Sequence, residues 1–206
     1  MESIGTIIQN TNIKSEKDFE LLANKLIRNY CIKCGDTEYR FAEIEFYYYK
    51  DDNNSLNNEW NQKTYPRNAN AGDLFFHYSG VDICFESNIN DGYFGGILIR
   101  SLLDDKRKRY ITGPLLCANE ILNSCSSKKV WPKIEPTSKL KCEIGVTKRY
   151  GITYSSNNTF DDKLCYFEKR LKETLKNTFE DVMWDYTHHR PKDITRNYTK
   201  RFNDGE

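Results

Sequence analysis

The chain has 206 residues, and its 31 lysines and arginines nearly balance its 30 aspartates and glutamates, for a formal net charge of +1. A chain of this length forms one domain, or one domain with appendages, and can bury a substantial core. The balanced charge excludes a protein drawn to nucleic acid or membrane by its overall field, so any basic footprint must be local. Seven cysteines, no hydrophobic leader and no long apolar run favour a cytoplasmic protein with free thiols and no membrane span.

The first predicted element is an amphipathic helix, and the cysteine pair that follows it lacks a metal-binding context. The helix is predicted over residues 15–30, because Ser15 is a suitable N-cap and apolar residues recur at helical spacing. Cys31 and Cys34 would need a second pair or histidines at ligand spacing to bind zinc, and the sequence around them has neither. A redox motif needs a helix after its cysteines, whereas Gly35 opens a turn. The sequence therefore predicts neither a metal site nor an organic cofactor.

A strand is predicted over residues 38–49, and its two glutamates make it the most informative segment of the chain. Side chains of a strand alternate between two faces, so Glu43 and Glu45 are expected on one face together with Phe41 and Tyr47. The opposite face is apolar enough to be core and consists of Ala42, Ile44, Phe46 and Tyr48. An acidic and aromatic face suits a water-activating carboxylate beside a flat ring that needs stacking. The alternative, which this segment alone favours, is an exposed edge strand with solvated glutamates.

The middle of the chain predicts a loop followed by strands. Residues 51–70 are polar and rich in asparagine, which predicts a long loop. Two strands joined by a turn are predicted over 73–85, and another turn over 88–92. Residues 93–103 predict a buried strand that contains one charge, Arg100. An unpaired charge in such a strand is costly, so this arginine is expected to meet a carboxylate or to emerge at a cleft, and both fit a site with Glu45 or Glu86.

The C-terminal half of the chain adds further helices to the predicted secondary structure. A helix is predicted over residues 115–122, after a Gly-Pro pair that suits a helix start. One or two strands are predicted around 143–146, and a long helix over 161–186, where apolar residues recur at helical spacing. Strands in the middle and helices near both ends predict an α+β fold.

Short signatures along the chain resemble, in the same order, those of the alkyladenine (methylpurine) DNA glycosylase family. Residues 42–47, A-E-I-E-F-Y, are similar to the family's V-E-T-E-A-Y. Four further segments are similar to motifs of the family: 67–80, 95–102, 112–122 and 143–146. The resemblance covers residues 17–150. It implies a single glycosylase-like domain over 1–206, in which 151–206 add a family-specific helix and a basic tail.

The resemblance also implies a fold and an activity. The expected fold is a mixed, partly curled antiparallel sheet flanked by helices, like the C-terminal domain of methionyl-tRNA formyltransferases. The expected activity is that of a monofunctional DNA glycosylase, which flips a modified base out of double-stranded DNA and hydrolyses its N-glycosidic bond with water. Such an enzyme is expected to act as a monomer without a cofactor. No lysine stands out as an amine nucleophile, so no strand-cleaving lyase step is expected.

Site residues follow from the resemblance, position by position. Glu45 falls on the family's catalytic glutamate, and Arg100 on the strand arginine that orders the site. Tyr47 falls on the aromatic residue that stacks against the flipped base. The second stacking residue is His77 or Phe76, although a lone histidine on an aromatic strand can equally be a core residue.

For contacts to the DNA duplex and its phosphates, the sequence names candidate residues but leaves alternatives open. Tyr78 is expected to be the wedge that fills the space vacated in the duplex. The cations of residues 106–109 are either a solvated loop or contacts to DNA phosphates. The same two readings apply to the pair 148–149 and to the basic tail. The residues concerned are Lys106, Arg107, Lys108, Arg109, Lys148, Arg149, Arg190, Lys192, Arg196, Lys200 and Arg201.

Two base-selecting groups of the family are missing from the sequence. A histidine of the family falls in residues 53–56, which contain none, and its guanine-excluding asparagine is replaced by Glu86 or Ser87. Glu86 could accept hydrogen bonds from an amino group or hydroxyls, which opens modified cytosine as a substrate beside alkylated purine. The sequence therefore predicts either repair or defence against phage DNA with modified bases. The alternatives are a non-catalytic nucleic-acid-binding module and an unrelated α+β enzyme that acts on a free nucleoside.

Overall fold

The computed structural model of the protein describes residues 2–50, 64–86, 93–149 and 164–171. Helix α1 (Ile4–Asn10) begins after Ser3, whose hydroxyl accepts a hydrogen bond from a backbone N–H of the first turn. Helix α2 (Glu16–Asn29) begins after Ser15, which forms a reciprocal capping box with Asp18. This confirms the helix predicted over 15–30, whereas α1 was not predicted.

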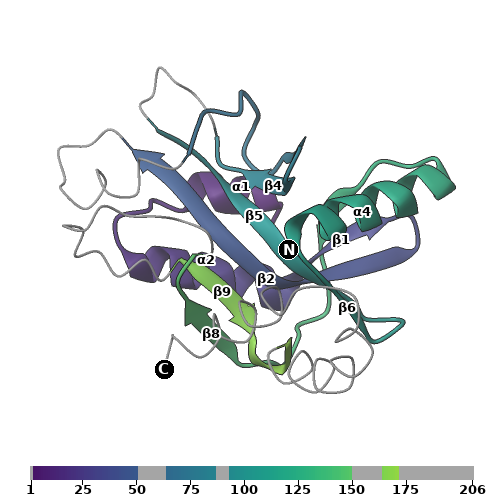
Figure 1. Cartoon of the computed structure of the whole chain (residues 1–206). Coiled ribbons are helices and arrows are strands. Elements are labelled where there is room, and N and C mark those ends of the chain that lie inside the picture. The colour runs from purple at the N-terminus through teal and green to yellow at the C-terminus, as the bar shows by residue number, and fades with distance from the viewer. Residues whose placement is uncertain (1, 51–63, 87–92, 150–163, 172–206) are drawn as a thin grey trace, which may run out of the picture.

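The strands form one curled antiparallel sheet flanked by helices, which confirms the predicted α+β class (Figure 1). The sheet order is β3-β4-β5-β2-β1-β7, with β6 paired to β5 and β9 paired to both β2 and β8. Every pairing among the described residues is antiparallel. The strands are β1 (Tyr30–Cys34), β2 (Thr37–Lys50), β3 (Leu74–His77), β4 (Gly80–Cys84), β5 (Tyr93–Asp104), β6 (Arg109–Thr112), β7 (Lys133–Pro136), β8 (Ile144–Thr147) and β9 (Cys165–Glu168).

Strand β2 lies in the centre of this sheet. It pairs with β5 along one side and with β1 and then β9 along the other. The alternative of an exposed edge strand is therefore wrong. The predicted strands over 73–85, 93–103 and 143–146 are confirmed by β3, β4, β5 and β8. Residues 51–63, 87–92, 150–163 and 172–206 lie outside the described residues. The expectations for most of the predicted loop over 51–70, for the turn over 88–92 and for the whole basic tail fall in these ranges.

The long helix predicted over 161–186 is wrong at its start, because Cys165–Glu168 form strand β9. Tyr166 packs in the main core, whereas Cys165 and Phe167 lie on the other face of the sheet. Such alternation between the two faces is typical of a strand, and β9 lies between β2 and β8 in the sheet. A short continuous apolar run fits a buried strand as well as a helix, and only the presence of pairing partners decides between them.

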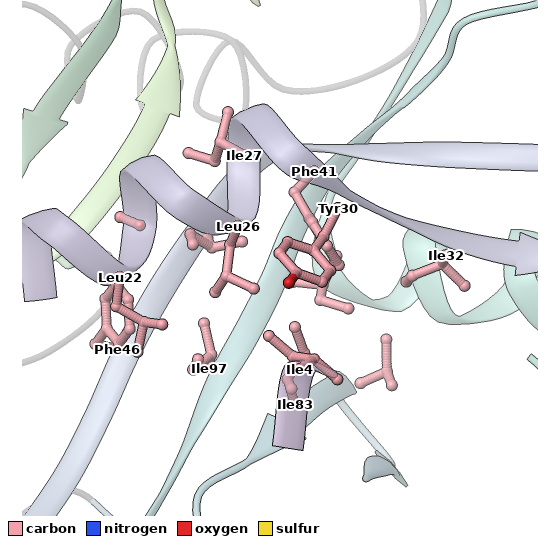
Figure 2. Packing of buried hydrophobic residues seen from close by; sticks show 14 of the residues in the cluster. Ile4, Leu22, Leu26, Ile27, Tyr30, Ile32, Phe41, Phe46, Ile83 and Ile97 are labelled. Carbon is pink, nitrogen blue, oxygen red and sulfur yellow. The ribbon is translucent and has the colours of Figure 1, made fainter. Parts of the chain in front are cut away.

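One face of the sheet packs against α1, α2 and α4 (Pro114–Lys128) to form the main core. Figure 2 shows Phe41 and Phe46 of β2 in the same cluster as Leu22 and Leu26 of α2. Helix α4 was predicted over 115–122 and extends to Lys128. The opposite face of the central strands is thereby left to carry the polar side chains described below.

Two consecutive β-bulges break the alternation that the sequence predicts for β2. Phe41 pairs with Leu102 and Glu43 with Ser101, so Ala42 is the extra residue on β2; Arg100 is the extra residue on β5. As a result, Phe41 packs in the main core and Ala42 in a smaller cluster on the other face, the reverse of the prediction. Bulges change the direction of side chains, and here they place consecutive residues on the face that carries both glutamates.

Candidate active site

The two glutamates of β2 form a buried ionic cluster with the arginine of β5. Glu43 and Glu45 are each 0% exposed, so the reading of solvated glutamates is wrong. Nη1 of Arg100 lies 3.2 Å from Oε2 of Glu45, and Nε of the same guanidinium lies 3.4 Å from Oε1 of Glu43. The sequence offered Glu45 and Glu86 as partners for this arginine; the structure selects Glu45 and adds Glu43. Buried charges are normally paired in this way, because an isolated ion in the interior is costly.

Neutral donors complete the hydrogen bonding of both carboxylates. The hydroxyl of Tyr47 donates to Oε1 of Glu45. Burial and the neighbouring Glu45 raise the pKa of Tyr47 well above its ordinary value, so the phenol keeps the proton that it donates. Glu43 accepts hydrogen bonds from Oγ of Ser101 at 2.8 Å and from Sγ of Cys165 at 3.3 Å. Each carboxylate is thus held by the cation and by separate donors.

Arg149 lies beside Tyr47, a position that the sequence analysis did not predict for it. Its guanidinium lies over the ring of Tyr47, 5.0 Å from the centroid, and its Nη1 donates to the carbonyl of Phe46 at 3.2 Å. Because Arg149 is buried, it does not fit the phosphate contact suggested for it, unlike the exposed Lys148. Arg149 follows β8, and its closeness to Tyr47 could be predicted only if the pairing of β8 with β9 and of β9 with β2 were known.

A second polar cluster lies two strands away on the same face. Asp82 pairs in register with Leu98, and Leu98 with Glu45. Neighbouring strands are separated by about 4.8 Å, so the backbones of Asp82 and Glu45 lie roughly 10 Å apart. Arg67 donates from Nε to Asp82 at 2.8 Å, and its Nη2 lies 2.8 Å from the same oxygen. Nε2 of His77 also approaches this carboxylate, at 3.5 Å.

Of the two candidates for the second stacking residue, His77 lies on the face of Glu45 and Phe76 does not. Phe76 packs against the main core, on the side of the sheet away from Glu45. His77 points to the opposite face and stacks against Phe75, with ring centroids 6.1 Å apart. Its Nδ1 accepts the backbone N–H of Ser79 at 3.4 Å and lies 2.9 Å from the hydroxyl of the same residue, while Nε2 faces Asp82 at 3.5 Å. Among the described residues Nε2 has no hydrogen-bond partner, so hydrogen bonds hold the imidazole through Nδ1 alone.

The remaining predicted residues lie apart from Glu45. Glu86 accepts a hydrogen bond from Gln9 of α1 at 2.7 Å and lines a hollow of about 280 Å³ beside that helix, which covers the core face. The structure therefore does not bring Glu86 together with Glu45. Tyr78, at the turn between β3 and β4, is 94% exposed.

The four cations of residues 106–109 are exposed, three on the turn after β5 and Arg109 at the start of β6, and three of the four have acidic partners. Arg107 pairs with Asp104, Lys108 with Asp105, and Arg109 with Glu120. Lys106 is exposed on the same turn. The Lys108–Asp105 pair lies at the surface, where ion pairs contribute little free energy, so a phosphate could replace this carboxylate; Asp104, the partner of Arg107, is buried. The turn therefore keeps both readings, solvated loop and phosphate contact.

Comparison with known proteins identifies no family for this chain. No protein-family model matches the sequence, and no curated protein is significantly similar to it. Within the described residues, no group of three or more histidines, cysteines, aspartates or glutamates could hold a metal ion. No helix in the same part of the chain is long and apolar enough to cross a membrane. The function must therefore be argued from the geometry of this face.

A substitution at Gly96 tests how closely the Glu45 cluster and the Asp82 cluster are packed against each other. It pairs with Tyr47 in the β2–β5 ladder, and a Cβ at this position would lie 2.6 Å from Cζ of Arg67. Gly96→Ala is expected to displace the guanidinium from Asp82 and to lower the free energy of unfolding by about 1–3 kcal/mol, as overpacked sites do. Urea denaturation measures the change, with the exposed Ser127→Ala as control. Equal stability of the two variants would show that Arg67 is not confined there.

Proposed function

We propose that the chain is a monofunctional DNA glycosylase that hydrolyses the N-glycosidic bond of a modified base. The observation that carries the proposal is the placement of Glu45: a buried carboxylate fixed by Arg100 and by the hydroxyl of Tyr47, on a face that also holds His77. The order of short motifs that resemble the alkyladenine glycosylase family adds support from the sequence.

In the proposed reaction, water attacks C1′ of an extruded nucleotide. Glu45 takes a proton from this water, and its negative charge stabilises the oxocarbenium-like transition state. Arg100 and Tyr47 hold the carboxylate in place, which lowers the entropic cost of reaching the reactive geometry. The base leaves, and an abasic site remains. Glu45 has no exposed surface, so this face must open for DNA to reach it.

The substrate is proposed by class. The Tyr47 ring, one face of which lies under Arg149, and the His77 imidazole are on the Glu45 face, whereas Glu86 lies beside α1 and is not part of the proposed base pocket. Either an alkylated purine or another modified base fits this description. Duplexes that carry alkylated purines and phage DNA with modified cytosine are to be incubated with the protein and assayed for abasic sites. If no abasic sites form in either kind of DNA, the proposal fails for both classes of substrate.

The second candidate is a non-catalytic module that binds nucleic acid on the same fold. The complete burial of Glu45 favours it, because a buried Glu–Arg–Glu cluster can serve structure alone. This candidate predicts salt-dependent DNA binding without release of any base. A binding assay and an abasic-site assay on the same duplexes separate the two candidates.

Tyr78 is proposed to enter the duplex when the base is extruded. Because its side chain is 94% exposed, Tyr78→Ala is expected to leave stability unchanged. It should weaken DNA binding by about 1–3 kcal/mol, the usual contribution of an aromatic ring stacked on a base. Fluorescence anisotropy with a duplex measures the affinity. Trp131→Ala, a change at another exposed aromatic residue, is the control, and equal losses in both variants would contradict the wedge.

A further inference from the structure

Glu43 has no part in the proposed reaction, yet it is as fully buried as Glu45. Its Oε2 accepts the hydroxyl of Ser101, and its Oε1 lies 3.3 Å from Sγ of Cys165 and 3.4 Å from Nε of Arg100. A second carboxylate in a dry interior is expensive to maintain, and replacing buried ionic groups by apolar ones is often neutral or stabilising. The presence of Glu43 therefore calls for a reason other than packing.

The bulges explain how Glu43 and Glu45 come to share one guanidinium. Arg100 is the extra residue of β5, so it and Ser101 both lie on the face of the glutamates. Glu43 takes the Nε side of the guanidinium, while Glu45 takes Nη1. A guanidinium is planar and rigid, so the ion pair with Glu43 on its Nε side, at 3.4 Å, restricts where Nη1 can lie. Ser101 and Cys165 hold Glu43 in turn.

We propose that Glu43 is a positioning residue for base release, which acts through Arg100 to hold the Glu45 carboxylate in place. This inference rests on the proposed glycosylase function. Glu43 itself touches neither the base nor the sugar. Its removal should therefore slow the chemical step and leave DNA affinity as it is, since a misplacement of about 1 Å at a reacting group can cost roughly a hundredfold in rate.

The kinetic test uses Glu43→Gln, which keeps the side-chain volume and an oxygen for Ser101 but removes the charge. Under single-turnover conditions, its base-release rate is expected to fall about 10- to 100-fold, while the enzyme concentration at half-saturation stays unchanged. Glu143→Gln, the same change at an exposed glutamate, is the control. In an Arg100→Lys background, Glu43→Gln should cause little further loss. A wild-type rate for Glu43→Gln, or an equal loss in both backgrounds, would overturn the proposal.

A second readout does not depend on activity. The Nε–H signal of Arg100 in an NMR spectrum, assigned by its loss in Arg100→Lys, is expected to shift in Glu43→Gln and, to a lesser extent, in Ser101→Ala. An unchanged signal in Glu43→Gln would overturn the positioning role. If the wild type releases no base from any DNA, the proposed function fails, and this signal still decides whether Glu43 holds the guanidinium. Ser101→Ala keeps the test open if Glu43→Gln does not fold.

Discussion

Glu45→Gln is expected to lower the rate of base release by about 10²–10⁴-fold, the usual contribution of a general acid–base group. The amide can still accept the hydroxyl of Tyr47, but it can neither take a proton from water nor offer negative charge to the sugar. DNA binding is expected to persist, because Glu45 is buried in the absence of DNA. Abasic sites counted after a single turnover measure the rate, and band shifts measure binding.

The control for this prediction is Glu143→Gln, which changes an exposed glutamate of the same chain. It should retain the wild-type rate, so that a loss confined to position 45 reports on the site. Full activity of Glu45→Gln would show that another group activates the water.

Of the substitutions proposed here, Arg100→Met is expected to lower the free energy of unfolding most, by about 3–5 kcal/mol, because it removes one partner from buried ion pairs. The change leaves Glu43 and Glu45 buried without the cation that both contact. Methionine keeps much of the aliphatic stem, so lost packing contributes little to the difference. Urea denaturation, monitored by tryptophan fluorescence or circular dichroism, gives the free energy of unfolding.

Lys169→Met is the comparison for Arg100→Met, because Lys169 forms an exposed ion pair with Glu143. Such surface pairs contribute about 0–1 kcal/mol. If both variants lost the same small amount of unfolding free energy, the buried ion pairs of Arg100 would not stabilise the fold more than a surface pair does, which would contradict the prediction.

Much of the fold was predictable because the signals are local. The cap at Ser15, the alternation along β2 and the apolar run of β5 each depend on residues close in sequence. The cost of an unpaired charge also predicted that Arg100 would meet a carboxylate or emerge at a cleft, and Glu45, which it meets, was one of the two carboxylates named. Local pattern and elementary electrostatics thus sufficed for the elements and for one pair of the site.

The rest depends on contacts between distant segments. The bulges at Ala42 and Arg100 are properties of the pairing of β2 with β5, and they reverse the faces expected for Phe41 and Ala42. Arg149 reaches Tyr47 only because β8 and β9 extend the sheet beside β2. Both the bulges and the position of Arg149 depend on pairing between distant segments, so neither could be predicted from the residues of one segment.

The most direct measurement is mass spectrometry of free bases released from modified DNA by the wild-type protein and by Glu45→Gln in parallel. The account predicts one class of modified base in the wild-type supernatant, an equal number of abasic sites in the DNA, and neither product with the variant. DNA that binds the wild-type protein yet yields no free base of any kind, or a variant that releases the base as fast as the wild type, would contradict it.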